Sequence, residues 1–190
     1  MTITILKILV CYLVLILIYA LSAYIAFTYT EKTPIKLIHK TTQYIEKVIE
    51  EGPIGIFRNN IAQATRMFMP IIGPLYAFII MMNTGQILGV YVESKYGTGP
   101  QGLVTLIFAL LVTILYPYAI IEILAYAIAL EASLTFTIKI FKHCVIDRRD
   151  ILSTLLKYCI SAILLIVAAY MEYLIISQAI TIIHSSIGSM

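Results

Sequence analysis

The sequence predicts an all-α fold: a single integral membrane domain over residues 1–190, built as a polytopic helical bundle with four to five membrane segments. Three observations carry this prediction. Of the 190 residues, 61% are hydrophobic and only 12% are charged, whereas a soluble domain is about half apolar and a quarter charged. The mean hydropathy is +0.98. Several apolar stretches reach the roughly 20 residues that a helix needs to cross the hydrocarbon core.

Composition also argues against some function classes. The net charge is +3, and the basic residues are spread over two polar segments instead of forming the stripe of a nucleic-acid-binding surface. We therefore expect membrane lipid, and no nucleic acid, among the partners. Cys11, Cys144 and Cys159 lack metal-ligand spacing, and neighbours such as His143 and Cys144 point in different directions. We expect neither a metal nor another cofactor.

Five apolar stretches are the predicted membrane segments, and in chain order they are about 3–28, 75–92, 103–116, 118–141 and 151–183. The first is too long for the apolar part of a cleaved signal, which spans about 7–15 residues. We therefore expect an uncleaved transmembrane helix. The last is longer than a bilayer is thick and has to tilt or protrude. Asp150 is its expected N-cap.

An amphipathic connector is expected over residues 34–68. Thr33-Pro34 is typical of a helix start and Gly52-Pro53 of a stop, so residues 34–51 are predicted to be a helix. This helix is either an ordinary connector or a dedicated partner-binding helix. Residues 54–68 are predicted to be a second, interfacial helix. Its apolar residues recur at helical spacing: Phe57, Ile61, Ala64 and Phe68.

Two stripes of small residues predict close helix packing. Gly85 and Gly89 form a Gly-x-x-x-Gly pair in the second span, which lets another helix approach closely. Ala125, Ala129 and Ser133 repeat every four residues and therefore share one face of a later helix.

Residues 103–141 are nearly twice as long as one crossing requires. Pro117 interrupts them, because proline lacks a backbone donor and clashes with the preceding turn. We predict a helical hairpin whose tip, Tyr116-Pro117-Tyr118, lies within or just beneath the far membrane surface. If the hairpin crosses twice, the polar segments 30–66 and 139–150 lie on opposite sides of the membrane. If it is re-entrant, both face the cytoplasm.

Three glutamates, Glu122, Glu131 and Glu172, lie inside apolar helices. A carboxylate near the bilayer centre costs about 3 kcal/mol on insertion scales, so it needs a polar partner or a proton. Glu122 and Glu131 are nine positions apart and project to roughly opposite sides of their helix. We expect Glu122 and Glu172 to form an intramembrane polar pair. Glu131 is expected to be an ordinary near-interface charge.

The expected partners of this pair are polar residues on the same or neighbouring helices. Tyr126 lies four residues beyond Glu122, on the same helix face. Asn83 and Gln86 lie at membrane depth in the second span. Such interhelical contacts average about 0.6 kcal/mol, so they contribute specificity more than stability.

Sparse motifs in this order resemble the stage II sporulation protein M family. They are Phe57-x-Asn59-Asn60, Asn83-x-Gly85-x-x-x-Gly89, a turn at Pro117 followed by Glu122, and Ala168-Ala169-x-x-Glu172. The resemblance covers about residues 54–183. The chain departs from the family where Tyr118 and Ala119 replace a His and a Gly. Asn83 and Gly85 are also one residue further apart than in the simple Asn-Gly form of the motif.

The resemblance implies a multi-pass membrane protein. In spore formers the family name implies a subunit that anchors cell-wall hydrolases. In archaea that lack murein it implies a scaffold or a transport-system component. The bias toward Ile, Tyr and Lys indicates an archaeal or AT-rich source.

Three functional hypotheses follow. The first is a non-enzymatic scaffold or assembly subunit in the cell membrane, as a homo-oligomer or with a membrane partner subunit. The alternative is a transporter or channel subunit that uses the intramembrane carboxylates. An intramembrane hydrolase is disfavoured, because His39, His143 and His184 lie in polar segments or at a membrane edge, away from the glutamates.

Overall fold

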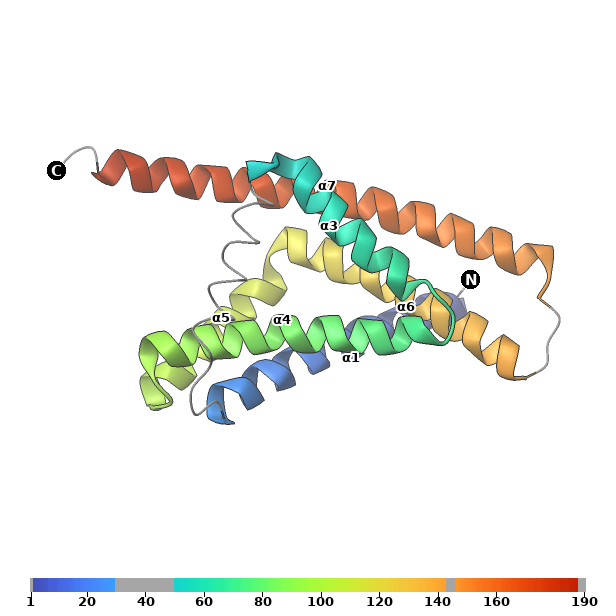
Figure 1. Cartoon of the computed structure of the whole chain (residues 1–190), viewed down its shortest axis with the longest axis horizontal. Coiled ribbons are helices and arrows are strands. Elements are labelled where there is room, and N and C mark those ends of the chain that lie inside the picture. Colours follow the sequence, from blue (N-terminus) through green and yellow to red (C-terminus); the bar gives the residue numbers. More distant parts are fainter. Residues whose placement is uncertain (1, 30–49, 143–145, 188–190) are drawn as a thin grey trace.

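The computed structural model describes residues 2–29, 50–142 and 146–187, and in this part the chain is helical throughout (Figure 1). The helices are α1 (Thr2–Tyr29), α3 (Gly52–Met67), α4 (Ile72–Tyr96), α5 (Pro100–Leu115), α6 (Pro117–Phe141) and α7 (Arg148–Ile187). The predicted helix at 34–51 lies almost entirely outside the described residues. The all-α fold class is confirmed.

Four helices are long and apolar enough to cross a membrane, namely α1, α4, α6 and α7. Their outward faces carry exposed leucine and isoleucine side chains, as lipid-facing helices do. The fifth predicted segment is the shorter apolar helix α5, whose 16 residues extend about 24 Å. The structure therefore fits a multi-pass membrane protein. With 40 residues, or about 60 Å, α7 is by far the longest helix described.

Helix α6 lies at the centre of the bundle and packs against α1 on one side and α7 on the other. Its small residues Ala125, Ala129 and Ser133 are fully buried. Because these side chains are short, the neighbouring helices approach closely, and the Ser161 hydroxyl of α7 donates a hydrogen bond to the Ala125 carbonyl at 3.1 Å. The predicted small-residue packing face of this helix is confirmed.

The Gly-x-x-x-Gly pair packs α4 against α1. A Cβ on Gly85 would overlap the Tyr19 carbonyl and the Ser22 hydroxyl, and one on Gly89 would overlap the Ala23 carbonyl. The two helices run in the same direction in Figure 1. The chain between them therefore has to return along the bundle, and α3 makes the last part of that return.

The turn between α3 and α4 is fastened to α6. Ser133 donates a hydrogen bond to the Met69 carbonyl at 2.6 Å, and Thr137 accepts one from the Ile71 amide at 2.7 Å. Ile71 has a φ of 67°, a left-handed conformation that is strained for a β-branched residue. The two hydroxyls therefore hold a strained turn, and they fix the position of α3.

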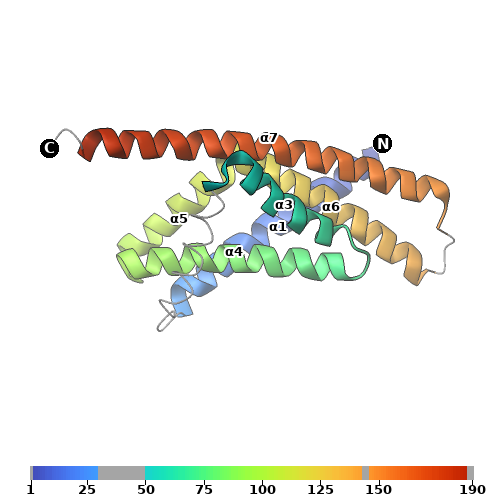
Figure 2. The ribbon, with the colours of Figure 1, turned by 45° about the horizontal axis from the view of Figure 1, so that its top comes forward.

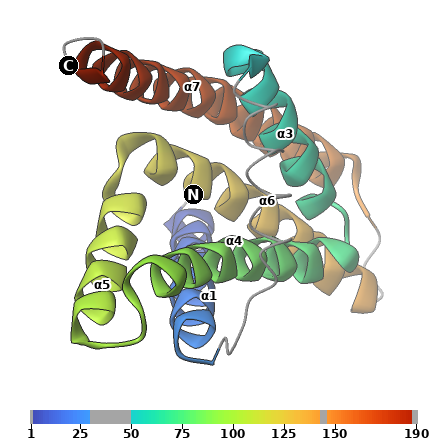
Figure 3. The same ribbon diagram turned by 60° about the vertical axis from the view of Figure 1, so that its left-hand side comes forward.

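Pro117 separates α5 from α6, which confirms the predicted helix break. Tyr116 is extended, with ψ 133°, and Pro117 starts α6, where no amide hydrogen is needed. The two arms diverge from this corner and do not lie side by side (Figure 3). Figures 1 and 2 show that α5 begins near one end of the molecule and α6 finishes near the other. The pair follows one bent path through the bundle.

Helix α7 begins three residues earlier than expected. Asp150 is not its N-cap, because the helix starts at Arg148 and Asp150 lies in the first turn. The Asp150 carboxylate accepts a hydrogen bond from the Asp147 amide at 3.1 Å. Asp150 thus satisfies an amide that precedes the helix, which is the reciprocal half of a capping box.

Candidate functional site

A cavity of about 400 Å³ lies among the helices, and every helix of the described part contributes to its wall. Its polar groups are two carboxylates, three amides and five hydroxyls. These belong to Glu122 and Glu172, to Asn59, Asn60 and Gln63, and to Tyr19, Thr84, Thr113, Tyr118 and Tyr126. The remaining wall is mainly isoleucine. A mostly apolar wall with a few convergent polar groups is typical of a small-molecule site.

The start of α6 supplies one side of the cavity. Tyr118, Glu122 and Tyr126 are four residues apart, so they stack along one helix face directly after Pro117. The Tyr126 hydroxyl donates a hydrogen bond to Glu122 Oε1 at 2.8 Å. The predicted contact between these two residues is confirmed.

Helix α7 supplies the second carboxylate. Glu172 lines the same cavity as Glu122, so the structure brings the predicted pair together in one site. They are not bonded to each other. Within the part of the chain that the structure describes, no hydrogen bond or ion pair reaches the Glu172 carboxylate.

The amides come from α3. Asn59 donates a hydrogen bond to Asn60 Oδ1 at 3.1 Å, and Asn60 is only 5% exposed. The buried face of this helix contains Ile56, Asn60, Ala64 and Met67. The predicted apolar residues Phe57, Ile61, Ala64 and Phe68 pack against the core. Beside them, Asn59, Asn60 and Gln63 line the cavity, because α4, α6 and α7 pack around α3.

Two predicted partners do not reach the site. Asn83 is exposed and Gln86 is half-buried on α4, and neither lines the cavity. Met81, Thr84 and Ile87 of the same helix line it instead, because they lie about one turn apart on its inner face. Gly85 and Gly89 face α1.

No basic residue is among the described residues that line the cavity. Two ionised carboxylates without a counter-charge are unfavourable in a low-dielectric region. Bound protons or a bound cation would balance these two charges. Among the described residues, no group of three or more His, Cys, Asp and Glu side chains is placed to hold a metal ion.

Comparison with protein-family models, with curated proteins and with solved structures finds no match. The geometry of the cavity is therefore the basis for a functional proposal.

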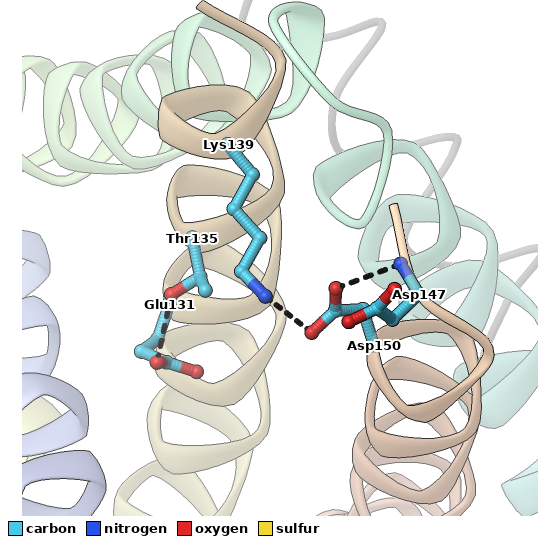
Figure 4. A network of polar contacts seen from close by, with 5 residues as sticks. All are labelled: Glu131, Thr135, Lys139, Asp147 and Asp150. Atoms are coloured by element: carbon cyan, nitrogen blue, oxygen red, sulfur yellow. Dashed lines mark hydrogen bonds and ion pairs between the residues drawn. The ribbon is translucent and has the colours of Figure 1, made fainter. Parts of the chain in front are cut away.

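Glu131 is not an ordinary near-interface charge, and that prediction is wrong. It is 4% exposed and forms an ion pair with Lys157 of α7 at 2.6 Å. Thr135 donates a second hydrogen bond to it at 3.0 Å. Lys139, one turn beyond Thr135, pairs with Asp150 across the same helix interface (Figure 4). We call these two ion pairs the α6–α7 clasp.

Several functional residues escaped the sequence analysis. Lys157 gave a usable signal, since it is a lysine two turns inside an apolar helix, where a buried charge needs a partner. Tyr19, Thr84 and Thr113 gave none. The two threonines bond to the carbonyls four residues earlier, Ile80 at 2.9 Å and Ala109 at 2.8 Å. Such bonds are common for threonine in any helix and do not mark a site.

Proposed function

We propose that this multi-pass membrane protein binds a cation inside the membrane as a subunit of a transport system, with Glu122 and Glu172 as the binding carboxylates. One observation carries the proposal. The two carboxylates face a shared cavity of about 400 Å³ whose described lining contains no basic side chain. A cation or protons would supply the missing charge, and intramembrane carboxylates arranged in this way are typical of ion pathways.

The break at Pro117 supports this proposal. Glu122 lies five residues after the proline, in the second turn of α6, so the carboxylate stands beside an interrupted helix. Transporters commonly place their ion and substrate sites at discontinuous helices near the bilayer midplane. The corner between α5 and α6 offers the same combination of a broken helix and a polar cavity.

The family resemblance supports a site at the same place. Asn59, Asn60, Glu122 and Glu172 belong to the motifs that resemble the stage II sporulation protein M family, and all four line the cavity. Residues from three of the four motifs thus converge on one location. This convergence favours a shared binding role over independent packing contacts.

A non-enzymatic scaffold or assembly subunit is the second candidate. Asn83 is exposed in the middle of the apolar helix α4. A polar side chain that faces outward from a membrane span needs a hydrogen-bonding partner. A second copy of this chain or a membrane partner subunit would provide one.

The experiment that separates these candidates uses Glu122→Gln and Glu172→Gln, singly and together. The wild type and variants are reconstituted in liposomes, and proton, Na⁺ and K⁺ fluxes are measured with internal indicators. We expect the variants to lose the flux while their oligomeric state in native gels is unchanged. Glu93→Gln, in the last turn of α4 and outside the cavity lining, is the matched control.

Loss of the assembled state in the glutamine variants, with no cation-dependent signal in the wild type, would favour the scaffold. Unchanged flux in the double variant would contradict the transport proposal.

A further inference from the structure

We infer that the ligand of the cavity is a small organic cation, an alkylammonium or alkyldiammonium ion, and not a bare metal ion. The inference rests on the proposed function, in that it assumes a cation binds between Glu122 and Glu172. It names the chemical class of that cation from the size, wall and hydrogen-bonding groups of the site.

The size of the cavity favours an organic ligand. Its volume of about 400 Å³ falls within the roughly 300–1,000 Å³ of small-molecule sites. A bare Ca²⁺ or Mg²⁺ ion instead requires about six or more oxygen ligands converging within roughly 2.0–2.6 Å. The described residues hold only two carboxylates here, contributed by different helices. A bare ion would leave most of the volume to water.

The wall of the cavity fits an alkyl chain. Apolar side chains from five helices surround the polar groups: Ile56, Ile80, Met81, Ile114, Ile123 and Ile176. Hydrated metal ions gain nothing from such a wall. An alkyl chain gains binding free energy for each CH₂ group that it buries. The wall therefore discriminates in favour of a ligand with a hydrocarbon body.

Unused acceptors in the cavity fit ammonium groups. Glu172 accepts no hydrogen bond within the described residues, and Glu122 uses only Oε1, for Tyr126. Asn60 is only 5% exposed. Its Oδ1 accepts one hydrogen bond, from Asn59, and has a second lone pair. An ammonium group offers three donors and no acceptor, which complements these oxygens.

Three aromatic rings add to this preference. Tyr19, Tyr118 and Tyr126 come from α1 and α6 and line the same cavity. The face of an aromatic ring attracts an organic cation, and the attraction is stronger when the site excludes water. With two carboxylates present, a diammonium ion balances the charge of the site completely, whereas a monoammonium ion leaves one carboxyl to be protonated.

The test measures binding of radiolabelled diaminobutane to the full chain in lipid nanodiscs. We expect saturable binding that excess unlabelled diaminobutane or butylamine displaces and that butanediol, Na⁺ and Mg²⁺ at matched ionic strength do not. Glu122→Gln and Glu172→Gln should each weaken binding about tenfold or more, as a lost charge-assisted hydrogen bond does. Glu93→Gln should bind as the wild type does.

A second measurement uses the wild type alone and so does not depend on the folding of a variant. Dicyclohexylcarbodiimide, a lipid-soluble reagent for protonated carboxyl groups, is applied with and without each amine, and labelled peptides are quantified by mass spectrometry. Protection of Glu122 and Glu172 by diaminobutane supports the inference. Protection by Na⁺ or Mg²⁺ but by no amine overturns it and leaves the proposed cation site standing. Absence of protection by any cation, with no flux, contradicts both.

Discussion

Each half of α6 contains a glutamate, and the two glutamates have different surroundings. Glu122, near its start, faces a cavity and has no counter-charge in the described lining. Glu131, nine positions later, is 4% exposed and is paired with Lys157 at 2.6 Å. Glu131 is buried and Glu122 is half-buried, but the larger contrast is in their neighbours. The difference lies in what the adjacent helix α7 presents, a lysine at one end and a second glutamate at the other.

This difference separates structural from functional carboxylates. The α6–α7 clasp joins the two helices over the second half of α6, where Figure 4 shows its Lys139–Asp150 pair. The Ser161 bond to Ala125 joins them once more, three residues beyond Glu122. Before Ala125, no described hydrogen bond or ion pair joins α6 to α7. The interface is therefore joined by ion pairs in the second half of α6, whereas the first two turns of α6 have no described polar bond to α7 beside the cavity.

The largest expected effect comes from breaking the clasp. Lys157→Met leaves the Glu131 carboxylate buried without its partner, and removing one member of a buried pair costs about 3–5 kcal/mol. Thermal unfolding in detergent should show a large drop in Tm. The double variant Glu131→Leu/Lys157→Met removes both charges and should recover most of the loss, since replacing a whole buried pair by apolar groups is often neutral. A single variant as stable as the wild type would contradict the structural role of the pair.

A smaller effect is expected from the α1–α4 interface, which contains no charges. Gly89→Ala places a Cβ against the Ala23 carbonyl, and overpacking of this kind costs about 1–3 kcal/mol. Tm should fall by less than in Lys157→Met. Gly99→Ala is the control, because a Cβ there meets nothing within 4 Å. Equal stability of the two glycine variants would show that the close approach of α1 and α4 is not needed.

The smallest effect on stability is expected at the cavity itself. Glu172→Gln removes a charge that has no described partner, so it should change the free energy of unfolding by less than about 1 kcal/mol or stabilise the protein. Its oligomeric state should be unchanged while its cation flux is lost. A drop in Tm comparable to that of Lys157→Met would contradict the distinction between the cavity carboxylates and the paired Glu131, because it would assign Glu172 a structural role.

Much of the fold could be predicted because its signals are local. The length of the apolar stretches predicts the membrane spans, and Pro117 predicts the helix break. The four-residue spacing of Glu122 and Tyr126 places both on one face of their helix. The spacing of Gly85 and Gly89 likewise predicts a close helix contact. These inferences need no knowledge of which helices are neighbours.

The remainder depends on tertiary arrangement. Asn60 of α3 is buried because three helices pack around α3, and no pattern within residues 54–68 reveals this. Tyr19 and Thr113 become part of the site through the positions of α1 and α5. The pairing of Glu131 with Lys157 requires the register of α7 on α6, which the sequence does not specify.

The most direct test of the contrast between the two halves of α6 is carbodiimide labelling of the wild type in lipid, read by peptide mass spectrometry. Glu122 and Glu172 have no counter-charge within the described cavity lining, and we expect dicyclohexylcarbodiimide, which reacts with protonated carboxyl groups, to modify at least one of them. Glu131 is buried in an ion pair with Lys157 and should remain unmodified. Labelling of Glu131 together with unreactive Glu122 and Glu172 would contradict the assignment of the cavity as the functional site.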